Sequence, residues 1–207
     1  GEKFRLPEIA PISHSMELNY RYGIFSRHTT WNTSRGKITL TTQRIASMQD
    51  VSMIGMRFEI HADFHADVEL LTGIDSKVWD LNGPHLEEVK LEECEGDLLV
   101  TAITHEKRIP IAVASAVHTD DSCEIKIARK EDKILHRICF ITRQGENFVA
   151  EKWVSVLTGQ HHDDPGAEAL KQVREKKQTG YQKMLDEHKA AWDKLWKHSE
   201  VLIKGDD

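Results

Sequence analysis

The sequence has no long apolar run, and its first residues show no pattern of a leader segment. Its apolar stretches fall well short of the roughly 18 residues that a membrane-spanning helix requires, so no membrane span is predicted. The first residues, GEKFRLPEIAP, include neither an apolar segment nor a cleavage site, and no signal peptide is expected. We therefore expect a cytoplasmic protein.

Cysteine is also scarce. The three cysteines, Cys94, Cys123 and Cys139, are widely spaced and include no CxxC pair. An odd, scattered set argues against a disulfide framework and against a zinc site, so free thiols in a reducing compartment are predicted. A net charge of −6 and the lack of a basic stripe argue against nucleic acid as a partner.

Short motifs for catalysis are missing as well. There is no GxSxG, no P-loop and no GxGxxG, and serine, histidine and aspartate are too scattered to nominate a catalytic triad. The sequence therefore nominates no catalytic residue and no metal ligand, and it leaves the substrate-binding residues unassigned. No cofactor is expected.

What the sequence does contain is a series of short strand patterns. In the clearest one, 51–60, apolar side chains from Ile54 to Ile60 alternate with a glycine and charged residues. In 148–158, Lys152 shares a face with Phe148 and Val154. Further strand patterns cover 18–30, 31–48 (a hairpin), 68–74, 98–104, 109–117, 123–128 and 134–141. With almost no helix between them, these runs predict a mainly β protein, an antiparallel β-sandwich.

After the last strand pattern the sequence changes character. Asp164 followed by Pro165 is typical of a helix N-terminus, and Gly180 ends or kinks that helix before a second one begins. The predicted organisation is a β-sandwich domain over 1–160, followed by two C-terminal linker helices over 161–207.

The second helix is amphipathic and carries two tryptophans. Stepping about 100° per residue gathers one set of side chains within a sector of about 120°. We expect this face to be buried against a large partner surface, because each indole ring has much apolar area to remove from water. The set consists of Tyr181, Met184, Leu185, His188, Trp192, Leu195 and Trp196.

Two histidine–aspartate clusters could in principle bind a metal ion. His161-His162-Asp163-Asp164 are adjacent in a polar loop and lack the spacing of a metal site, so a solvated turn leading to a helix N-cap is the favoured interpretation. The run HADFHAD at 61–67 places His61, Asp63, His65 and Asp67 at a period of two, which on one strand would share a face. A solvated face or loop is favoured there too.

A loop at 78–88, VWDLNGPHLEE, combines Trp79 and His85 with a turn-forming Asn-Gly-Pro. Loops of this composition on a β scaffold often contact sugars through ring stacking and hydrogen bonds. The simpler interpretation, a structural turn whose tryptophan caps the core, is favoured. The alternative function that follows from the loop is a stand-alone, non-catalytic carbohydrate-binding or interaction module.

The C-terminal segment HKAAWDKLWKHSEVLIKGDD resembles the segment that joins the two main domains in glycoside hydrolase family 65. Weaker similarities to the family occur upstream and in the same order, at 18–31, 42–60, 73–86 and 151–160, and they include Arg44, Ser47 and Met48. The residues that match the C-terminal pattern are His188, Trp192, Trp196, Ile203, Gly205 and Asp206.

The resemblance implies a three-part parent enzyme with an N-terminal β-sandwich, a helical linker and an (α/α)₆ barrel. Most family members are inverting phosphorylases of α-glucosidic disaccharides such as maltose, trehalose, kojibiose or nigerose, and a few are hydrolases. A glutamate of the barrel acts as general acid while inorganic phosphate, the co-substrate, attacks C1. This chain is therefore expected to consist of the sandwich, without its early strands, and the helical linker. We expect it to support the barrel and a homodimer, and to be inactive alone.

Overall fold

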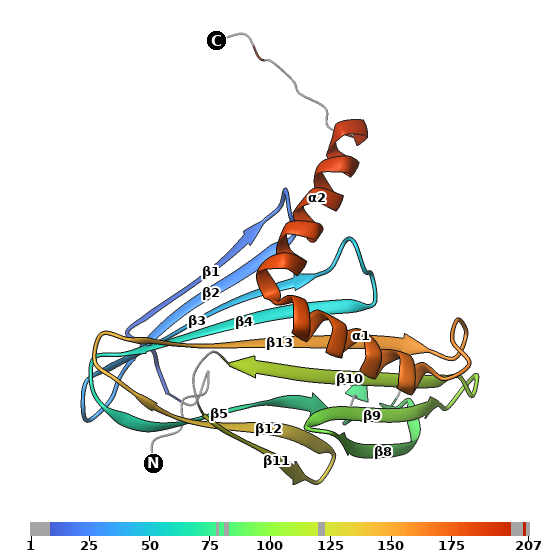
Figure 1. Ribbon diagram of the computed structural model, residues 1–207, viewed down its shortest axis with the longest axis horizontal. Helices are drawn as coiled ribbons and strands as arrows, with labels where there is room; N and C mark the ends of the chain where they lie inside the picture. The colour runs from blue at the N-terminus through green and yellow to red at the C-terminus, as the bar shows by residue number, and fades with distance from the viewer. Residues whose placement is uncertain (1–8, 78, 81–82, 120–122, 200–204, 206–207) are drawn as a thin grey trace.

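The computed structural model describes residues 9–77, 79–80, 83–119, 123–199 and 205. Figure 1 shows three layers: two helices on one face of a large β-sheet, and a small sheet on its other face. The strands are antiparallel and the two helices come last in the chain. The prediction of a mainly β, antiparallel sandwich followed by two C-terminal helices is confirmed.

The large sheet has eight strands in the order β1-β2-β3-β4-β13-β10-β9-β8. The first four strands follow one another as a meander, and β13, the last strand of the chain, pairs with β4. Their bounds are β1 Ser13–Asn19, β2 Ile24–Asn32, β3 Lys37–Ala46, β4 Met53–Ala62, β8 Leu86–Cys94, β9 Asp97–Thr104, β10 Pro110–Thr119 and β13 Asn147–Thr158.

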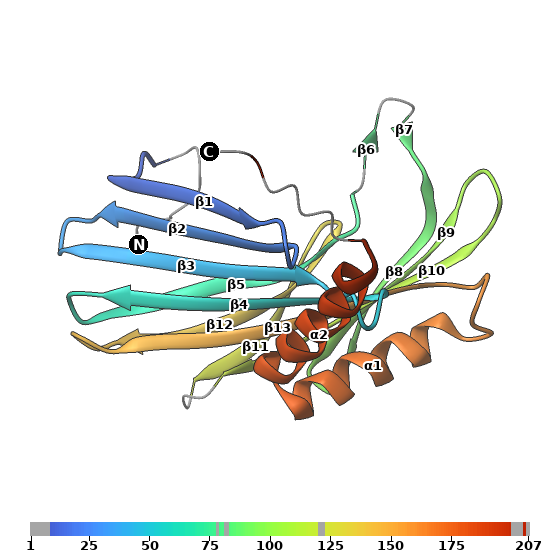
Figure 2. The ribbon, with the colours of Figure 1, turned by 90° about the horizontal axis from the view of Figure 1, so that it is seen from above.

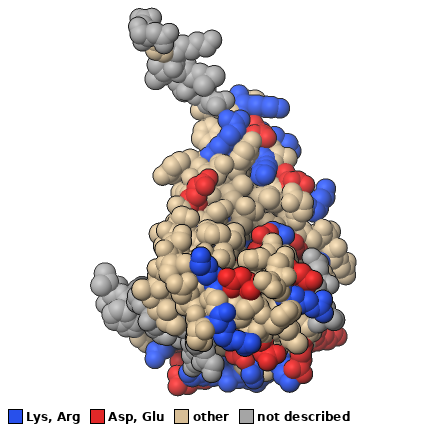
Figure 3. All heavy atoms as spheres, turned by 90° about the vertical axis from the view of Figure 1, so that its left-hand side faces the viewer, with Lys and Arg blue, Asp and Glu red and all other residues tan. Residues whose placement is uncertain are grey.

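The small sheet has three strands in the order β11-β12-β5, and a separate two-stranded hairpin is formed by β6 and β7. Charged pairs such as Lys133–Asp75 and Arg137–Glu69 connect β12 with β5. Figure 3 shows charged residues gathered at the lower margin of the molecule, where this sheet lies. The bounds are β5 Ala66–Asp75, β6 Trp79–Asp80, β7 Gly83–Pro84, β11 Glu124–Lys130 and β12 Lys133–Thr142.

Helices α1 (Pro165–Thr179) and α2 (Tyr181–Ser199) pack on the other face of the large sheet. Seen from above, they cover one end of the sheet and leave much of β1–β4 open (Figure 2). The alanines of β10 are small enough to let α1 approach closely. One apolar core lies between the helices and the sheet, and it includes Ala112, Ala114, Ala116, Trp153, Val173, Met184 and Leu185.

A second core fills the space between the two sheets. It combines alternate side chains of β2, β3, β4 and β13 with those of β5 and β12, as the period of two in a strand requires. Phe140 and Phe148 stack within this core, with ring centroids 3.5 Å apart. Its other buried members include Trp31, Ile38, Phe58, Ile60 and Ile138.

Most of the individual sequence predictions hold. The 31–48 hairpin forms with its turn between Asn32 and Lys37, and the three cysteines are free thiols. Strand β1 was not predicted, since the pattern at 18–30 spans the end of β1, a turn and most of β2. Strand β8 was not predicted either, because its acidic pairs are typical of a solvent-facing run. No helix in the described part of the chain is long and apolar enough to span a membrane.

Candidate functional site: contact of the C-terminal helix with the sandwich

The start of α2 is fixed by contacts with β13 and β3. Helix α1 ends at Gly180, whose φ of 84° lies in the left-handed region that glycine favours. The backbone N–H of Tyr181 then donates to the Glu151 carboxylate at 2.9 Å, and the Tyr181 hydroxyl donates to Gln43 at 3.1 Å. A carboxylate at a helix N-terminus complements the helix dipole. These contacts set where α2 begins and which face it turns to the sheet.

His188 joins the middle of α2 to two loops of the sandwich, and its side chain is fully buried. The backbone N–H of Met48 donates to Nδ1 at 3.0 Å, and Nε2 contacts the carbonyl oxygen of Tyr22. Since a carbonyl oxygen only accepts, the two contacts require a neutral imidazole with its proton on Nε2. Burial lowers the pKa of His188; the Tyr22 carbonyl opposes this effect and Lys189 adds to it.

The two tryptophans of α2 lie on the turn between β1 and β2. The Trp192 and Trp196 rings stack at 6.1 Å between centroids, and Trp196 Nε1 donates to the carbonyl oxygen of Arg21. Gly23, with φ of 59°, brings its backbone against the indole of Trp192, where a Cβ would lie 3.6 Å from the ring. The family-like residues His188, Trp192 and Trp196 therefore all contact one turn of the sandwich.

The sequence prediction for this helix is right for its first half and wrong for its second. Tyr181, Met184 and Leu185 are buried, but Trp192 and Trp196 are only partly buried and Leu195 is 41% exposed. The reason is geometric: α2 continues past the end of the sheet (Figure 1), and within the described chain its last turns contact the β1–β2 turn. Ile203 and Asp206, which completed the family-like pattern, lie outside the described residues.

The predicted N-cap of α1 is confirmed. Asp164 Oδ1 accepts a hydrogen bond from the Ala167 backbone N–H at 3.0 Å, and Pro165 occupies the first helical position. We expect Asp164→Ala to lower the free energy of unfolding by about 1 kcal/mol, because one helix N–H loses its acceptor. Urea unfolding measures the change. Asp163→Ala, at an exposed neighbouring position, is the matched control, and equal effects of the two substitutions would contradict the prediction.

The second histidine–aspartate cluster does not converge. His61 is in β4 and Asp67 in β5, with a turn between them, so the run is not one strand with a shared face. His61 Nδ1 contacts Asn147, and Asp63 accepts from the Lys37 N–H at 2.7 Å. Within the described ranges, no three His, Cys, Asp or Glu side chains form a group that could hold a metal ion.

The loop at 78–88 divides into the β6–β7 hairpin and the start of β8. The side chain of Trp79, on which the sugar-binding interpretation depended, lies outside the described residues. His85 pairs with Glu106 in the turn between β9 and β10, and Arg108 of that turn pairs with Glu87 at 2.6 Å. The described part of the loop and the start of β8 thus form ion pairs with the β9–β10 turn.

Comparison with known proteins gives the family. The profile described as "Glycosyl hydrolase family 65, N-terminal domain" matches residues 1–195. The chain belongs to glycosyl hydrolase family 65. The family predicted from the sequence is therefore confirmed.

Family 65 relatives match almost all of this chain. It is 30% identical to the nigerose phosphorylase of Lachnoclostridium phytofermentans, covering 99% of this chain and 30% of that protein. It is 26% identical to the kojibiose phosphorylase of Halothermothrix orenii, covering 100% of this chain and 29% of that protein. The chain thus spans less than a third of the length of these relatives.

A solved structure shares the fold of this family 65 domain. The structure, assigned to the kojibiose phosphorylases and from the human microbiome, matches with a TM-score of 0.85 over 94% of this chain and 26% of its own. Sequence identity is 14%, so this match shows the fold alone.

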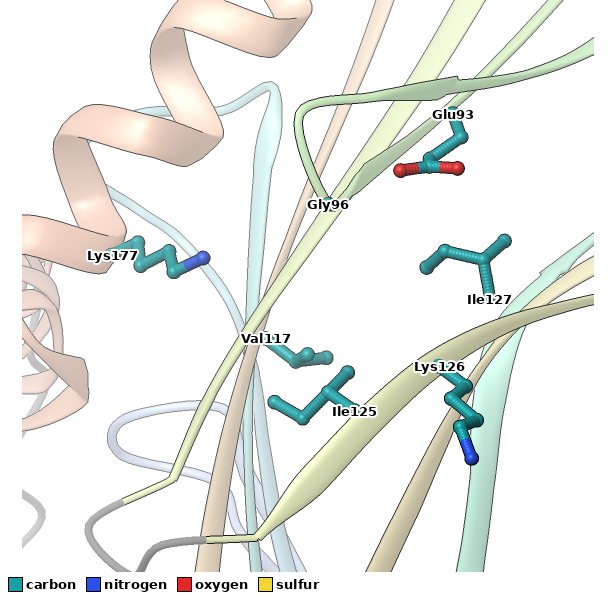
Figure 4. Close-up of a pocket in the computed structure, with 7 residues that line it drawn as sticks. All are labelled: Glu93, Gly96, Val117, Ile125, Lys126, Ile127 and Lys177. Carbon is teal, nitrogen blue, oxygen red and sulfur yellow. The ribbon is translucent and has the colours of Figure 1, made fainter.

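One cavity of the family 65 domain, of about 480 Å³, lies among the β8–β9 turn, β10, β11 and α1. Figure 4 shows Lys177 pointing toward it from α1 and Lys126 pointing away; Lys126 pairs with Glu124 at 2.7 Å. Glycoside hydrolysis typically uses a pair of carboxylates, whereas the lining includes a single one. The lining residues are Glu93, Gly96, Val117, Ile125, Lys126, Ile127 and Lys177.

Two buried titratable side chains between the sheets were not nominated from the sequence. Lys152 Nζ donates to Thr72 Oγ1 at 3.1 Å and to the Gly73 carbonyl at 2.9 Å. Burial lowers its pKa to about 8, and the charge of Arg44 adds to that effect. His136, also fully buried, bonds through Nε2 to the Gly96 carbonyl at 3.0 Å, and burial lowers its pKa. The signal for Lys152 was its place among apolar residues in 148–158.

Proposed function

We propose that this chain is the N-terminal domain of an enzyme that phosphorolyses an α-glucosidic disaccharide with inversion, releasing β-glucose 1-phosphate. The carrying observation is that three relatives named as phosphorylases, of nigerose, 1,2-α-glucosylglycerol and kojibiose, each align with 99–100% of the chain. Inorganic phosphate is the proposed co-substrate, and no other cofactor is proposed.

In this proposal the chemistry belongs to a catalytic barrel of the same polypeptide, separate from the sandwich and its two helices. The sandwich supports that barrel through α2, which rises away from the sheets (Figure 1). Its last turns offer apolar surface: Trp192 and Trp196 are partly exposed, and Leu195 is 41% exposed. Apolar surface of this kind on a helix favours a packing partner.

The side of the sandwich at β1 is also proposed to be covered in the whole enzyme. The large sheet has eight strands and the small one three, and Met16 on β1 is 64% exposed. Further strands of the same domain would cover this surface. A homodimeric assembly and a cytoplasmic location complete the proposal.

The test compares this chain with a longer polypeptide that contains it. With nigerose or kojibiose and inorganic phosphate, the longer protein is expected to release glucose 1-phosphate and the isolated chain to release none. A coupled glucose 1-phosphate assay measures both. Activity in the isolated chain would overturn the proposal that catalysis belongs to a separate barrel. Hydrolysis of these disaccharides by the longer protein without phosphate would overturn the proposal that it is a phosphorylase.

A further inference from the structure

Three cationic side chains share the inner face of the large sheet, toward β1, with Arg44 between Arg27 and Lys152. Arg27 is directly opposite Thr42 in the β2–β3 register, and Phe25 is opposite Arg44. The Arg44 guanidinium lies over the Phe25 ring, 5.7 Å from its centroid, which places both on one face. Lys152 follows two strands away, since Met56 is paired with Arg44 on one side and with Lys152 on the other.

These side chains present hydrogen-bond donors that lack acceptors. The Nε atoms of Arg27 and Arg44 are buried and have no hydrogen-bond partner, and the same holds for the Thr42 hydroxyl between them. The Lys152 ammonium has three N–H groups, of which two are accounted for by Thr72 and Gly73. A buried donor without an acceptor destabilises the folded chain, so several in one place indicate a missing acceptor.

No carboxylate of the described residues forms an ion pair with this group. Burial lowers the pKa of both Arg27 and Lys152, and Arg44 lowers each further by repulsion. The chain does not lack acids, since it has 34 Asp and Glu against 28 Lys and Arg. Elsewhere cations are paired, for example Arg174 with the buried Asp97 at 3.0 Å.

The group is open to solvent on the β1 side. Arg27 and Arg44 are only partly buried, and β1, the edge strand beyond them, is exposed along its whole length. Met16 and Leu18 of β1 lie on the same face, opposite Arg27 and Phe25 in the register. In the isolated chain a small ligand can therefore reach the guanidinium groups without opening the sandwich; in the whole enzyme the strands proposed to cover β1 would enclose the bound ion.

We propose that Arg27, Thr42, Arg44 and Lys152 form a binding site for a small oxyanion. Guanidinium groups bind phosphate and carboxylate oxygens through paired N–H donors, and hydroxyl and ammonium groups complete such a site. A single bound oxyanion would accept the unused hydrogen bonds and offset the three positive charges. The site is independent of the proposed activity, because it lies wholly within this chain.

Inorganic phosphate is the probe, titrated into the isolated chain at pH 7 with sodium chloride of equal ionic strength as the reference. We expect saturable binding by calorimetry and a Tm higher by about 5 °C at 100-fold excess over Kd. Arg27→Gln and Arg44→Gln are each expected to weaken binding at least tenfold, about 1.4 kcal/mol. Thr42→Val, which keeps shape and charge, should weaken it several-fold.

Arg143→Gln is the matched control, because Arg143 is exposed and pairs only with its neighbour Glu146 at 3.6 Å among the ion pairs of the described chain. It should bind phosphate as the unmodified chain does. Absence of binding, or an equal phosphate effect on all variants, would overturn the site. Self-association that is lost in Arg44→Gln, without phosphate binding, would also overturn it, since a carboxylate of a second copy would then be the acceptor.

Discussion

Replacing His188 with alanine is expected to lower the free energy of unfolding by about 3 kcal/mol. The substitution leaves the Met48 N–H and the Tyr22 carbonyl without their partner in a buried place, at about 1–3 kcal/mol for each unsatisfied group. It also opens a cavity, since the ring is fully buried. Urea unfolding followed by circular dichroism measures the global change.

The same experiment followed by tryptophan fluorescence reports on the end of α2. Trp192 and Trp196, two of the five tryptophans of the chain, lie beyond His188 on the β1–β2 turn, so part of the emission change is expected at lower urea than the circular dichroism change. Lys194→Ala, at an exposed position of the same helix, is the control and should stay within about 0.5 kcal/mol of the unmodified chain. An unchanged His188→Ala variant would show that His188 does not hold the helix to the sandwich.

The free energy of unfolding is expected to increase as pH rises from 7 to 10, because Lys152 loses its proton. Its pKa in the folded chain is about 8 against an ordinary 10.5, so in this window the unfolded chain binds more protons. Stability then increases with pH, by about 2–3 kcal/mol for this single group. The physical reason is that the folded chain need no longer bury an ammonium charge once the group is neutral.

The measurement is the difference between the unmodified chain and Lys152→Met in phosphate-free buffer. The variant should lose the rise between pH 7 and 10, while Lys130→Met, on the exposed end of β11, should keep it. Work below pH 10 avoids Tyr181, whose pKa is raised by burial and which lowers stability only at higher pH. A parallel pH profile in the Lys152→Met variant would contradict the burial of a charged lysine.

Local pattern was enough to predict those elements that are buried on one face. The alternation from Ile54 to Ile60 gave β4 with its correct inner face, and Asp164 with Pro165 gave the start of α1. The strand β8 was missed because it is an edge strand with little buried surface, so its charged residues outweighed its weak alternation. A local sequence pattern does not show whether a strand lies at the edge or in the middle of a sheet, and β8 was missed for that reason.

The contacts that define the sites come from residues far apart in the chain. Helical periodicity predicted that Trp192 lies on the same face as Met184. Whether that face is covered by the sheet depends on how far the sheet extends, and Trp192 is only partly buried. Likewise, alternation put Lys152 on the core face. That Arg44, and Arg27 beyond it, would lie on the same face without an ion pair to a described carboxylate depends on strand order.

The shared core of helices and sheet has a practical consequence. Trp153 and the alanines of β10 share one buried core with Val173 and Met184, so the sheet and the helices stabilise each other. We expect the sheet, α1 and the first half of α2 to unfold together. A recombinant fragment that ends after β13 would expose this apolar surface and aggregate; a soluble one has to extend through the end of α2.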